Sequence, residues 1–377
     1  MNVSYWEKKS FFGLQDLIVV GSGIVGLSAA IHFKTKYPQK KVLIIERGII
    51  PQGASTKNAG FACIGSAGEL LSDLVNDDET TVFSLVERRK RGLDLLRATL
   101  GDKAICYEPL GGYELFENED KYAKIAQKID YLNKSLSEIT GNKSTFSSAD
   151  SEINDFGFKG IQHLIKNNCE GQIDTGKMML ALEACAQKLG VQLLYGCSIK
   201  NVIQNSKISG VVLENGMSIE SNKVLVCTNG FAKDLLPELD VVPARAQVLV
   251  TSRIENLKIK GSFHFDEGYY YFRNIDDRIL FGGGRNLDFK GERTNEFGNT
   301  PIIMNRLKQM LDELILPNQK YSIDHVWSGI MAFGENKNPI VKQVESNIFC
   351  AVRLGGMGVA IGSLVGQEAV ELMLDNV

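Results

Sequence analysis

The sequence is poor in the residues on which disulfide scaffolds and metal sites depend. It has seven cysteines and four histidines among 377 residues, and no two cysteines form a C-x-x-C pair. An odd number of scattered cysteines indicates reduced thiols, and no spacing of cysteine or histidine matches a metal site. We therefore expect a cytoplasmic protein whose chemistry needs no metal. The cysteines are Cys63, Cys106, Cys169, Cys185, Cys197, Cys227 and Cys350.

The chain also lacks long apolar runs and basic tracts. No apolar stretch reaches the roughly 18–20 residues of a membrane span. The first residues, MNVSYWEKKSFFG, have no apolar core, so we expect no secretory signal. A net charge of −3 without a basic tract argues against a nucleic-acid binder. The length suggests two domains, or one domain with a large insertion.

A glycine-rich turn near the N-terminus is the strongest signal that is present. Leu17–Val20 is a short apolar run typical of a strand, and Leu27–Phe33 continues after the turn as a helix without Pro or Gly. A second apolar run, Val42–Ile45, ends in Glu46. Strand, turn, helix, strand and an acid about twenty residues past the glycines predict a dinucleotide site. The turn, a G-x-G-x-x-G, consists of Gly21, Ser22, Gly23, Ile24, Val25 and Gly26.

The glycines of this turn have separate physical tasks. Gly21 permits the tight turn, Gly23 lets backbone N–H groups approach a pyrophosphate, and Gly26 lets the helix pack closely on the strand. The N-terminus of the helix adds positive potential and N–H donors for the phosphates. Glu46 would accept hydrogen bonds from the ribose hydroxyls of an adenosine.

A second glycine-rich turn and helix, LGGMGVAIGSLVGQEAVELML, lies at the C-terminus. It indicates a second backbone approach to the same ligand. The first domain is then discontinuous in sequence, and the aromatic β-rich region 247–284 is inserted as a layer that faces the substrate. Helices are further predicted within 70–100 and over 120–136, 174–189 and 300–316, and strands over 111–116, 191–195, 199–204, 210–213, 224–227, 327–332 and 348–352.

Several segments together resemble one family, the FAD-dependent amino acid and amine oxidoreductases related to D-amino acid oxidase, glycine oxidase and sarcosine oxidase. The matching pieces follow the family order over most of the chain: VVGSGIVGLSAA with IIER, GASTKNAGF, EGQIDTGKMMLALEACAQKLGV, YGCSIKNV, VLVCTNGFAKDLL, PARAQ, GYYYFRNIDDRILFGG and VRLGGMGVAIGSLVGQ. The tail is most similar to the bacterial amine and γ-glutamylputrescine oxidoreductase branch.

The resemblance implies an α/β fold, with a Rossmann-type FAD-binding domain and an inserted antiparallel β-sheet substrate domain. We expect the FAD-binding domain to comprise 1–80, 155–240 and 325–377, and the substrate domain 81–154 and 241–324. Non-covalent FAD is the expected cofactor. Cys63, close to the flavin segment, is expected to be a small packed residue rather than a covalent link to the flavin.

The resemblance also implies the residues that contact FAD. The pyrophosphate would lie on the turn 21–26, and the adenosine ribose on Glu46, which Arg47 follows. The remaining positions match segments beside the flavin, the diphosphate or the adenine: Ser55, Thr56, Asn58, Ala59, Gly60, Phe61, Ile199, Thr228, Asn229, Gly230, Gly329, Gly355, Gly356, Met357, Gly358 and Val359.

The substrate side departs from the family pattern at one important position. Relatives that oxidise α-amino acids clamp the substrate carboxylate with an arginine, which suits bidentate pairing. The corresponding segment here is WSGIMAF, with Met331 at the arginine's position. Either another arginine, Arg285 or Arg353, does this work, or the substrate has no α-carboxylate near the flavin.

Two tyrosines are candidates for positioning the substrate. In GYYYFR, Tyr269 and Tyr271 point to one side of a strand, and Tyr270 and Phe272 to the other. Tyr269 matches the tyrosine with which the family contacts its substrate. In PARAQ, Ala246 stands where the family has glycine.

The expected activity is oxidation of the C–N bond of an amine or amino acid to an imine, by hydride transfer to flavin N5. Electrons would pass to O₂ or to another acceptor. One alternative is oxidation of a 2-hydroxy acid, which needs a base for the hydroxyl, and His325 suits that role poorly. Another is a flavin-binding subunit without turnover of its own.

Overall fold

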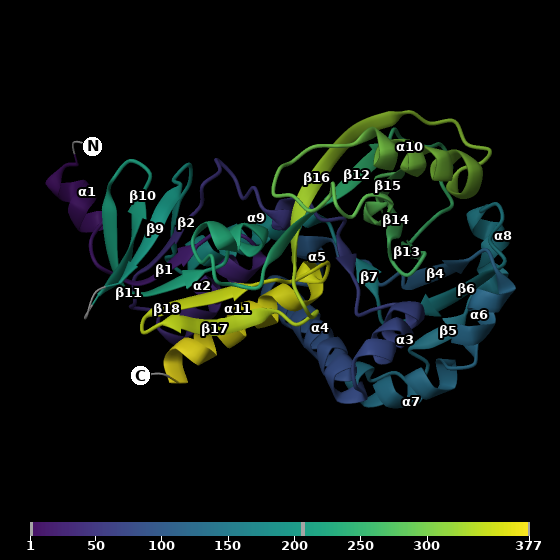
Figure 1. Ribbon diagram of the computed structural model, residues 1–377, viewed down its shortest axis with the longest axis horizontal. Helices are drawn as coiled ribbons and strands as arrows, with labels where there is room; N and C mark the ends of the chain where they lie inside the picture. Colours follow the sequence, from purple (N-terminus) through teal and green to yellow (C-terminus); the bar gives the residue numbers. More distant parts are fainter. Residues whose placement is uncertain (1–2, 205–207, 376–377) are drawn as a thin grey trace.

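The computed structural model describes residues 3–204 and 208–375. The predicted FAD-binding domain also includes residues 1–2, 205–207 and 376–377, which lie outside the described ranges. The molecule is elongated and has two halves, each built on an eight-stranded sheet of the described residues. Figure 1 shows the first half, with both termini, on the left and the second on the right. The α/β fold with a Rossmann-type half is therefore confirmed.

The first sheet has the parallel core expected of a dinucleotide-binding fold. β1 (Gln15–Val20) lies between β2 (Val42–Ile45) and β11 (Ser218–Val226), and all three run parallel. The order across the sheet is β17 (Ile340–Glu345), β18 (Ile348–Val352), β11, β1, β2 and β8 (Gln192–Leu194), with β10 (Ser209–Leu213) and β9 (Ile199–Gln204) pairing antiparallel beside β11.

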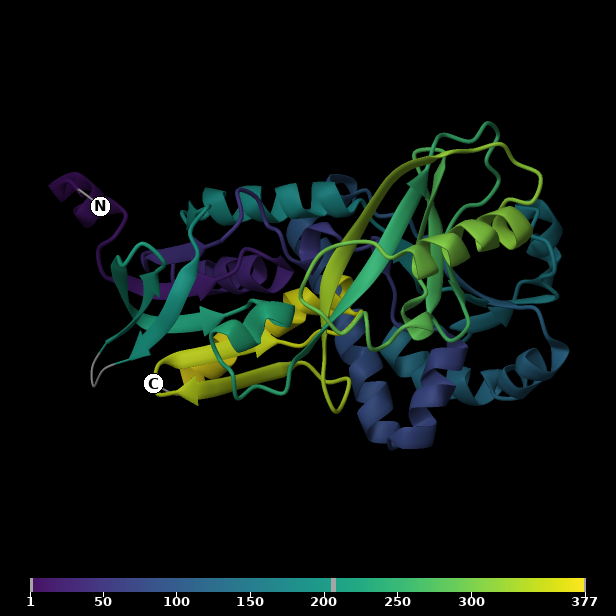
Figure 2. The ribbon, with the colours of Figure 1, turned by 45° about the horizontal axis from the view of Figure 1, so that its top comes forward.

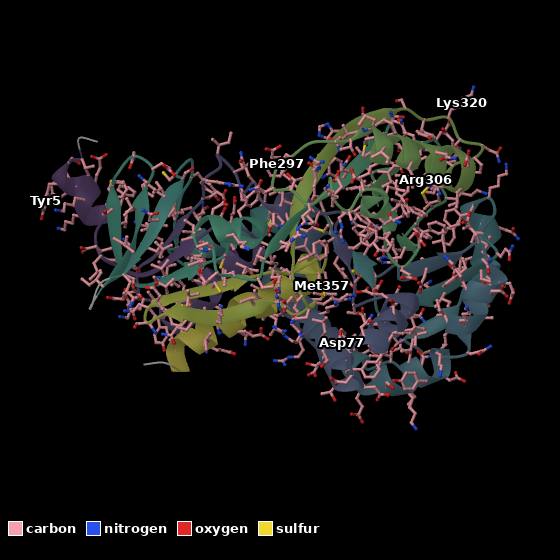
Figure 3. All side chains as sticks on the ribbon, viewed as in Figure 1. Tyr5, Asp77, Phe297, Arg306, Lys320 and Met357 are labelled. Atoms are coloured by element: carbon pink, nitrogen blue, oxygen red, sulfur yellow. The ribbon has the colours of Figure 1, made fainter. Side chains whose placement is uncertain are left out.

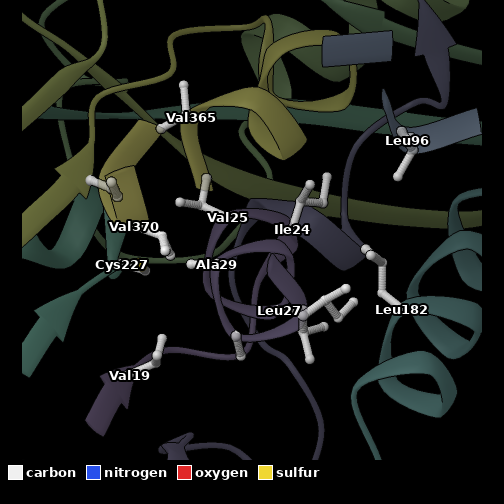
Figure 4. Close-up of a cluster of buried hydrophobic side chains, with 14 of the residues drawn as sticks. Val19, Ile24, Val25, Leu27, Ala29, Leu96, Leu182, Cys227, Val365 and Val370 are labelled. Atoms are coloured by element: carbon white, nitrogen blue, oxygen red, sulfur yellow. The ribbon is translucent and has the colours of Figure 1, made fainter. Parts of the chain in front are cut away.

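A layer of helices covers one face of this sheet. The layer consists of α2 (Ile24–Lys36), α4 (Glu79–Leu100), α5 (Asp102–Ile105), α9 (Thr175–Lys188) and α11 (Gly358–Asp375). Leu17 and Val19 of β1 pack into it, while Ile18 and Val20 pack on the opposite side with β10, β11 and the turn Asn229–Asp234. Figure 4 shows α2 among side chains from α4, α9 and α11. Because β1 is buried on both faces, it reads as a continuous apolar run.

The second sheet is antiparallel for most of its width. Its order is β16 (Ile323–Phe333), β12 (Val242–Thr251), β15 (Arg278–Gly283), β14 (Tyr270–Ile275), β13 (Ser262–Phe265), β4 (Gly112–Phe116), β6 (His163–Asn167) and β5 (Phe146–Ser148). The long strands β12 and β16 lie next to the first half in both ribbon views (Figures 1 and 2). A two-stranded pair, β3 (Phe61–Ala62) with β7 (Gly171–Gln172), completes the sheets.

Helices cover the outer face and the far end of the second sheet. α10 (Pro301–Met310) and the π-helical turn Leu311–Ile315 pack on β12–β15. The far end carries α3 (Ala67–Asn76), α6 (Glu119–Ala126), α7 (Ile129–Thr140) and α8 (Ile153–Phe156), and the short α1 (Tyr5–Ser10) lies at the N-terminus. None of the helices in the described ranges combines the length and apolarity that a membrane crossing requires.

Five elements lie outside the half predicted for their residues, among them α5, which was expected in the substrate domain but belongs to the helix layer on the first sheet. β6 and most of β16 fall in ranges expected for the FAD-binding domain, yet both pair in the second sheet. α4 was expected in the substrate domain but packs with α2 and α11, whereas α3 packs with α7 and β5. Periodicity shows which face of an element is apolar, but not which distant element covers it. The domain boundaries stay a prediction.

The alternation along β14 predicts unequal effects of two substitutions. Phe272 is 1% exposed, and its ring stacks on Phe263 with centroids 4.7 Å apart. We expect Phe272→Ala to lower the free energy of unfolding by about 3–5 kcal/mol through a core cavity. Tyr269→Ala, three residues earlier in the chain and 36% exposed, should cost about 1 kcal/mol or less. Urea unfolding of both variants measures this, and equal losses would contradict the assignment of faces.

Candidate active site

One long cavity of about 1160 Å³ lies between the two halves. Met357, labelled near the centre of Figure 3, belongs to its wall. Most of the predicted cofactor residues line it: Gly21, Gly23, Ile24, Val25, Glu46, Arg47, Ser55, Asn58, Ala59, Gly60, Phe61, Ile199, Thr228, Asn229, Gly329, Gly355, Gly356, Met357, Gly358 and Val359. Four predicted residues do not, namely Ser22, Gly26, Thr56 and Gly230.

Three of these four residues shape the wall from behind. Ser22 is buried, and its N–H and hydroxyl both donate to Glu46 Oε2 at 3.1 Å, so the acid is fixed at the end of β2. A Cβ on Gly26 would lie 2.1 Å from Gly21 O, so only glycine allows this approach. The Thr56 hydroxyl donates to Pro51 O at 2.7 Å and holds the following loop.

The N-terminus of α2 meets the loop that follows β2. The backbone N–H of Ile24 donates to Ser55 Oγ at 2.9 Å. A Cβ on Gly23 would lie only 2.8 Å from that same oxygen. The turn, the helix start and Ser55 therefore form one close-packed concave surface.

The loop 55–61 is held in place by the side chain of Asn58. Its Oδ1 accepts from Gly60 N at 2.9 Å and from Thr175 Oγ1 at 2.8 Å, and its Nδ2 donates to Ser55 O at 2.8 Å. Each end of the amide is thus occupied by the loop itself or by α9. The loop presents backbone and small side chains to the cavity with little freedom to move.

The C-terminal turn also lines the cavity. A Cβ on Gly356 or Gly358 would meet nothing within 4 Å, so any side chain there would project into open space. Asn229, at φ +46°, accepts through Oδ1 from the N–H groups of Arg353 and Leu354 and fixes this turn. Thr228 lines the cavity, and its buried hydroxyl oxygen has no hydrogen-bond partner among the described residues.

The second sheet supplies the aromatic wall. Tyr270 and Phe272 are buried in its outer core, while Tyr269 and Tyr271 line the cavity. The Tyr271 ring meets Phe61 edge-on at 5.7 Å, and burial raises the pKa of Tyr271 to about 12. Its hydroxyl therefore stays protonated at neutral pH.

The two candidate arginines have very different surroundings. Arg353 pairs with Asp240 and donates from Nη2 to Asn336 Oδ1 and Asn338 O, both at 2.8 Å. The Arg285 side chain has no hydrogen bond or ion pair within the described ranges. Its guanidinium lies against two rings, 4.4 Å from the centre of Phe333 and 4.9 Å from that of Phe289. Burial lowers the pKa of Arg285.

Met331 lines the cavity on β16, as its position in WSGIMAF predicts, and contributes neither charge nor donor. Arg245 and Gln247 of PARAQ are structural. The Arg245 guanidinium binds the buried Glu292 through Nε at 3.0 Å and Nη2 at 2.8 Å, and Gln247 Nε2 donates to the same carboxylate at 2.9 Å. Ala246, between them, lines the cavity.

Cys63 and His325 lie in different places with respect to the cavity. Cys63 lines the cavity, and burial together with nearby Glu170 raises the pKa of its thiol, so the reactive thiolate is disfavoured. His325 stacks on Trp327 at the surface of β16 and does not line the cavity. Among the described residues, no group of three or more His, Cys, Asp or Glu side chains could hold a metal ion.

Sequence reasoning missed a polar cluster at one end of the cavity. Arg89 Nη2 donates to Glu69 Oε1 at 2.8 Å, and Lys337 adds a second cation beside that carboxylate. Burial raises the pKa of Glu69, but Arg89 and Lys337 outweigh it and lower the value to about 2. His264 also lines the cavity. The sequence offers one signal for His264. Its segment SFHF is followed by a turn and then by GYYYF, so the two segments can pair as neighbouring strands.

Comparison with known proteins agrees with this geometry. Residues 16–372 match the family described as "DAO: FAD dependent oxidoreductase". The chain is 22% identical to the probable oxidoreductase OrdL of Haemophilus influenzae, over 96% of this chain and 83% of the relative. It is 24% identical to the γ-glutamylputrescine oxidoreductase of Escherichia coli, over 95% and 83%. Glycine oxidase from Bacillus cereus has a similar fold, with a TM-score of 0.77 at 18% identity over 96% of each chain.

The residues present fit an FAD. A glycine turn with Glu46 at one end, the open Cβ positions of Gly356 and Gly358, and the unpaired Thr228 hydroxyl leave space and hydrogen-bonding capacity for a long polar ligand. The N-termini of α2 and α11 both reach the cavity wall, where they favour negative charge.

A bulky residue at position 23 tests this fit. We expect Gly23→Leu to yield protein with little or no flavin, because its side chain would occupy the space between α2 and Ser55. The ratio of absorbance at about 450 nm to that at 280 nm measures the bound flavin. Gly176→Ala, in α9 and away from the cavity, has 3.4 Å to its nearest neighbour and should keep full flavin. Normal flavin content in Gly23→Leu would refute the site.

Proposed function

The chain belongs to the FAD-dependent oxidoreductase family, as its motifs predict, and we propose that it oxidises the C–N bond of an amine or amino acid to an imine. When bound, FAD would supply the acceptor for the hydride that leaves the carbon next to nitrogen, and the imine would be hydrolysed by water. The names of relatives support this substrate class, because they include a γ-glutamylputrescine oxidoreductase and a glycine oxidase.

The protein's part in this reaction is binding and orientation. Tyr269 and Tyr271 face the cavity beside the loop 55–61, and we assign them the positioning of the substrate. The Tyr271 hydroxyl remains a donor, and Phe61 supports its ring edge-on. Apolar contacts that exclude water strengthen the polar contacts that remain.

The strongest support for the proposal is that the Arg285 guanidinium has no hydrogen-bond or ion-pair partner among the described residues. A half-buried cation without a partner is unfavourable, and a substrate anion would supply one. The flanking rings of Phe333 and Phe289 hold the guanidinium plane without using its donors. Arg353 cannot take this role, since Asp240, Asn336 and Asn338 occupy its donors. We therefore propose a substrate whose carboxylate reaches Arg285 rather than residue 331.

Two further features belong to this proposal. The electrons pass to O₂ or to another acceptor. The protein works in the cytoplasm, which its seven free cysteines support because reduced thiols are the rule in that compartment.

Acid precipitation tests whether the flavin is attached covalently. Because burial disfavours the Cys63 thiolate, we expect acid to release the flavin into the supernatant. Absorbance of the supernatant and the pellet at about 450 nm measures the division. Flavin retained in the pellet would contradict non-covalent binding, and loss of that retention in Cys63→Ala would identify the link.

Anaerobic bleaching of the bound flavin tests the reaction and the substrate class together. The panel should contain glycine, sarcosine, a γ-glutamylated diamine, the free diamine and 2-hydroxy acids. We expect the γ-glutamylated diamine to bleach the flavin fastest, since its carboxylate is remote from the reacting carbon. Bleaching by 2-hydroxy acids alone would replace the proposal by the alternative, and no bleaching would indicate a subunit without turnover.

Arg285→Met tests the anchor. The lost charge-assisted pair is worth about 1.5–3 kcal/mol, so the affinity for the carboxylated amine should fall roughly ten- to a hundredfold. The affinity for the free diamine should not change. Arg293→Met, an exposed arginine outside the cavity, is the matched control. Equal rates for Arg285→Met and the native protein, or fast bleaching by glycine alone, would contradict this role.

A further inference from the structure

A buried histidine lies on the same sheet face as the proposed substrate tyrosine. His264 on β13 is paired directly opposite Tyr271 on β14 and opposite Glu114 on β4. Residues paired in this way project to one face of a sheet. The His264 side chain is 14% exposed, lines the cavity and meets the ring of Phe61 edge-on at 5.2 Å.

A carboxylate lies behind this histidine, fixed by the backbone. Glu170, between β6 and β7, is wholly buried, and its Oε1 accepts from Ile64 N at 2.8 Å and Gly65 N at 2.9 Å. Its Oε2 lies 3.9 Å from His264 Nε2. Both atoms are buried, and neither has a hydrogen-bond partner among the described residues.

Room for this carboxylate depends on a glycine. A Cβ at Gly112 would lie 1.9 Å from Glu170 Oε2, so any other residue there would displace the carboxylate from His264. A buried carboxyl oxygen without a hydrogen bond and an unpaired imidazole nitrogen are both costly. Transfer of a hydride to the flavin uses neither group.

The surroundings disfavour the charged form of both groups. Burial raises the pKa of Glu170 to about 7 and lowers that of His264 to about 4. The ion pair of Glu69 and Arg89 acts on both, because Glu69 raises and Arg89 lowers each pKa. The other titratable side chains that face them are Cys63, Tyr271 and Glu114.

We propose that His264, backed by Glu170, is the base that removes a proton from the ammonium group of the bound substrate. The inference rests on the proposed amine oxidation, since an ammonium nitrogen has no lone pair with which to expel a hydride from the adjacent carbon. In the step, an N–H bond of the ammonium breaks and an N–H bond to the imidazole forms. The lone pair stays on the amine, and the Glu170 carboxylate compensates the new imidazolium charge. No electron is transferred.

His264 is then a catalytic residue, and Glu170 a positioning residue that acts through it. The pair can accept a proton only when Glu170 is ionised, so reactivity should rise as pH rises through about 7. Without the pair, the amine has to lose its proton in water, where its own pKa is near 10.

The experiment measures anaerobic flavin bleaching by the γ-glutamylated diamine, below saturation, between pH 5.5 and about 10. Three variants of the holoenzyme are compared, each with its flavin content and thermal midpoint. In Glu170→Gln, the amide oxygen still accepts from Ile64 and Gly65, but the group that faces His264 no longer ionises. His264→Gln removes the base. Glu114→Gln is the matched control, a buried carboxyl on the same face whose Oε2 accepts from Gly68 N at 2.8 Å.

The expected result has three parts. The native protein and Glu114→Gln lose reactivity as pH falls through about 7. In Glu170→Gln and His264→Gln this limb moves to higher pH, with a loss on the order of a hundredfold at pH 7.5. A flat native profile from pH 6 to 8, or unchanged profiles in the two variants, would overturn the inference.

Imidazole ¹⁵N NMR supplies a readout that does not depend on turnover. The four histidines of the chain allow assignment of His264 from its absence in His264→Gln. Its nitrogen shifts should change near pH 7 in the native protein and in Glu114→Gln, and not in Glu170→Gln. A shift change that survives in Glu170→Gln would contradict the pairing.

The outcomes separate this inference from the proposed function. If amines bleach the flavin while both variants keep the native profile, only the role of His264 and Glu170 fails. If no amine bleaches it, or only 2-hydroxy acids do, the proposed function fails and the ammonium proton acceptor fails with it.

Discussion

A single buried guanidinium joins the two halves at the cavity. Arg273 on β14 is 3% exposed, and its Nη1 donates to Gly60 O at 2.9 Å and to Ile173 O at 2.6 Å. Burial lowers the pKa of Arg273 to about 10, so it remains charged at neutral pH, with backbone carbonyls as its partners. A Cβ on Gly60 would lie 2.7 Å from this nitrogen. The loop 55–61 is therefore tied to β14, and this contact helps to set the spacing between the two sides of the cavity.

The two walls are built from different chemistry. The wall proposed to hold the cofactor consists mainly of backbone, glycine and small polar side chains that lie close together in the sequence. At some of its positions only glycine fits, because a Cβ would clash with a neighbouring atom. Its parts were therefore predictable from the sequence: the turn 21–26, Glu46, and the glycines before α11. The alternation of residues 269–272 was predictable for the same reason, since its period of two is local.

The wall proposed to face the substrate was predictable only in part, because its contacts join segments that are distant in the sequence. No local pattern brings Glu170 behind His264, or shows that Arg353 is saturated by Asp240 while Arg285 is not. Likewise, the places of β6 and β16 in the second sheet follow from strand pairing rather than from periodicity. The helix predicted over 300–316 ends in a π-helical turn at Leu311–Ile315. Leu311, Leu314 and Ile315 of this turn all pack against β12–β15, which a regular helical period does not predict.

The order of strands relates the two proposed contacts to the size of the substrate. Arg285 follows β15 directly, His264 lies on β13, and β14 with Tyr271 runs between them. Two strand spacings amount to about 9–10 Å between backbones. An α-amino acid carries its amine and carboxylate on one carbon, and so it spans only a fraction of that width. A substrate with several bonds between the amine and the carboxylate could engage Arg285 at one end and present its ammonium to His264 at the other. Methionine at position 331 fits the same substrate, because a clamp there would hold the carboxylate beside the reacting carbon.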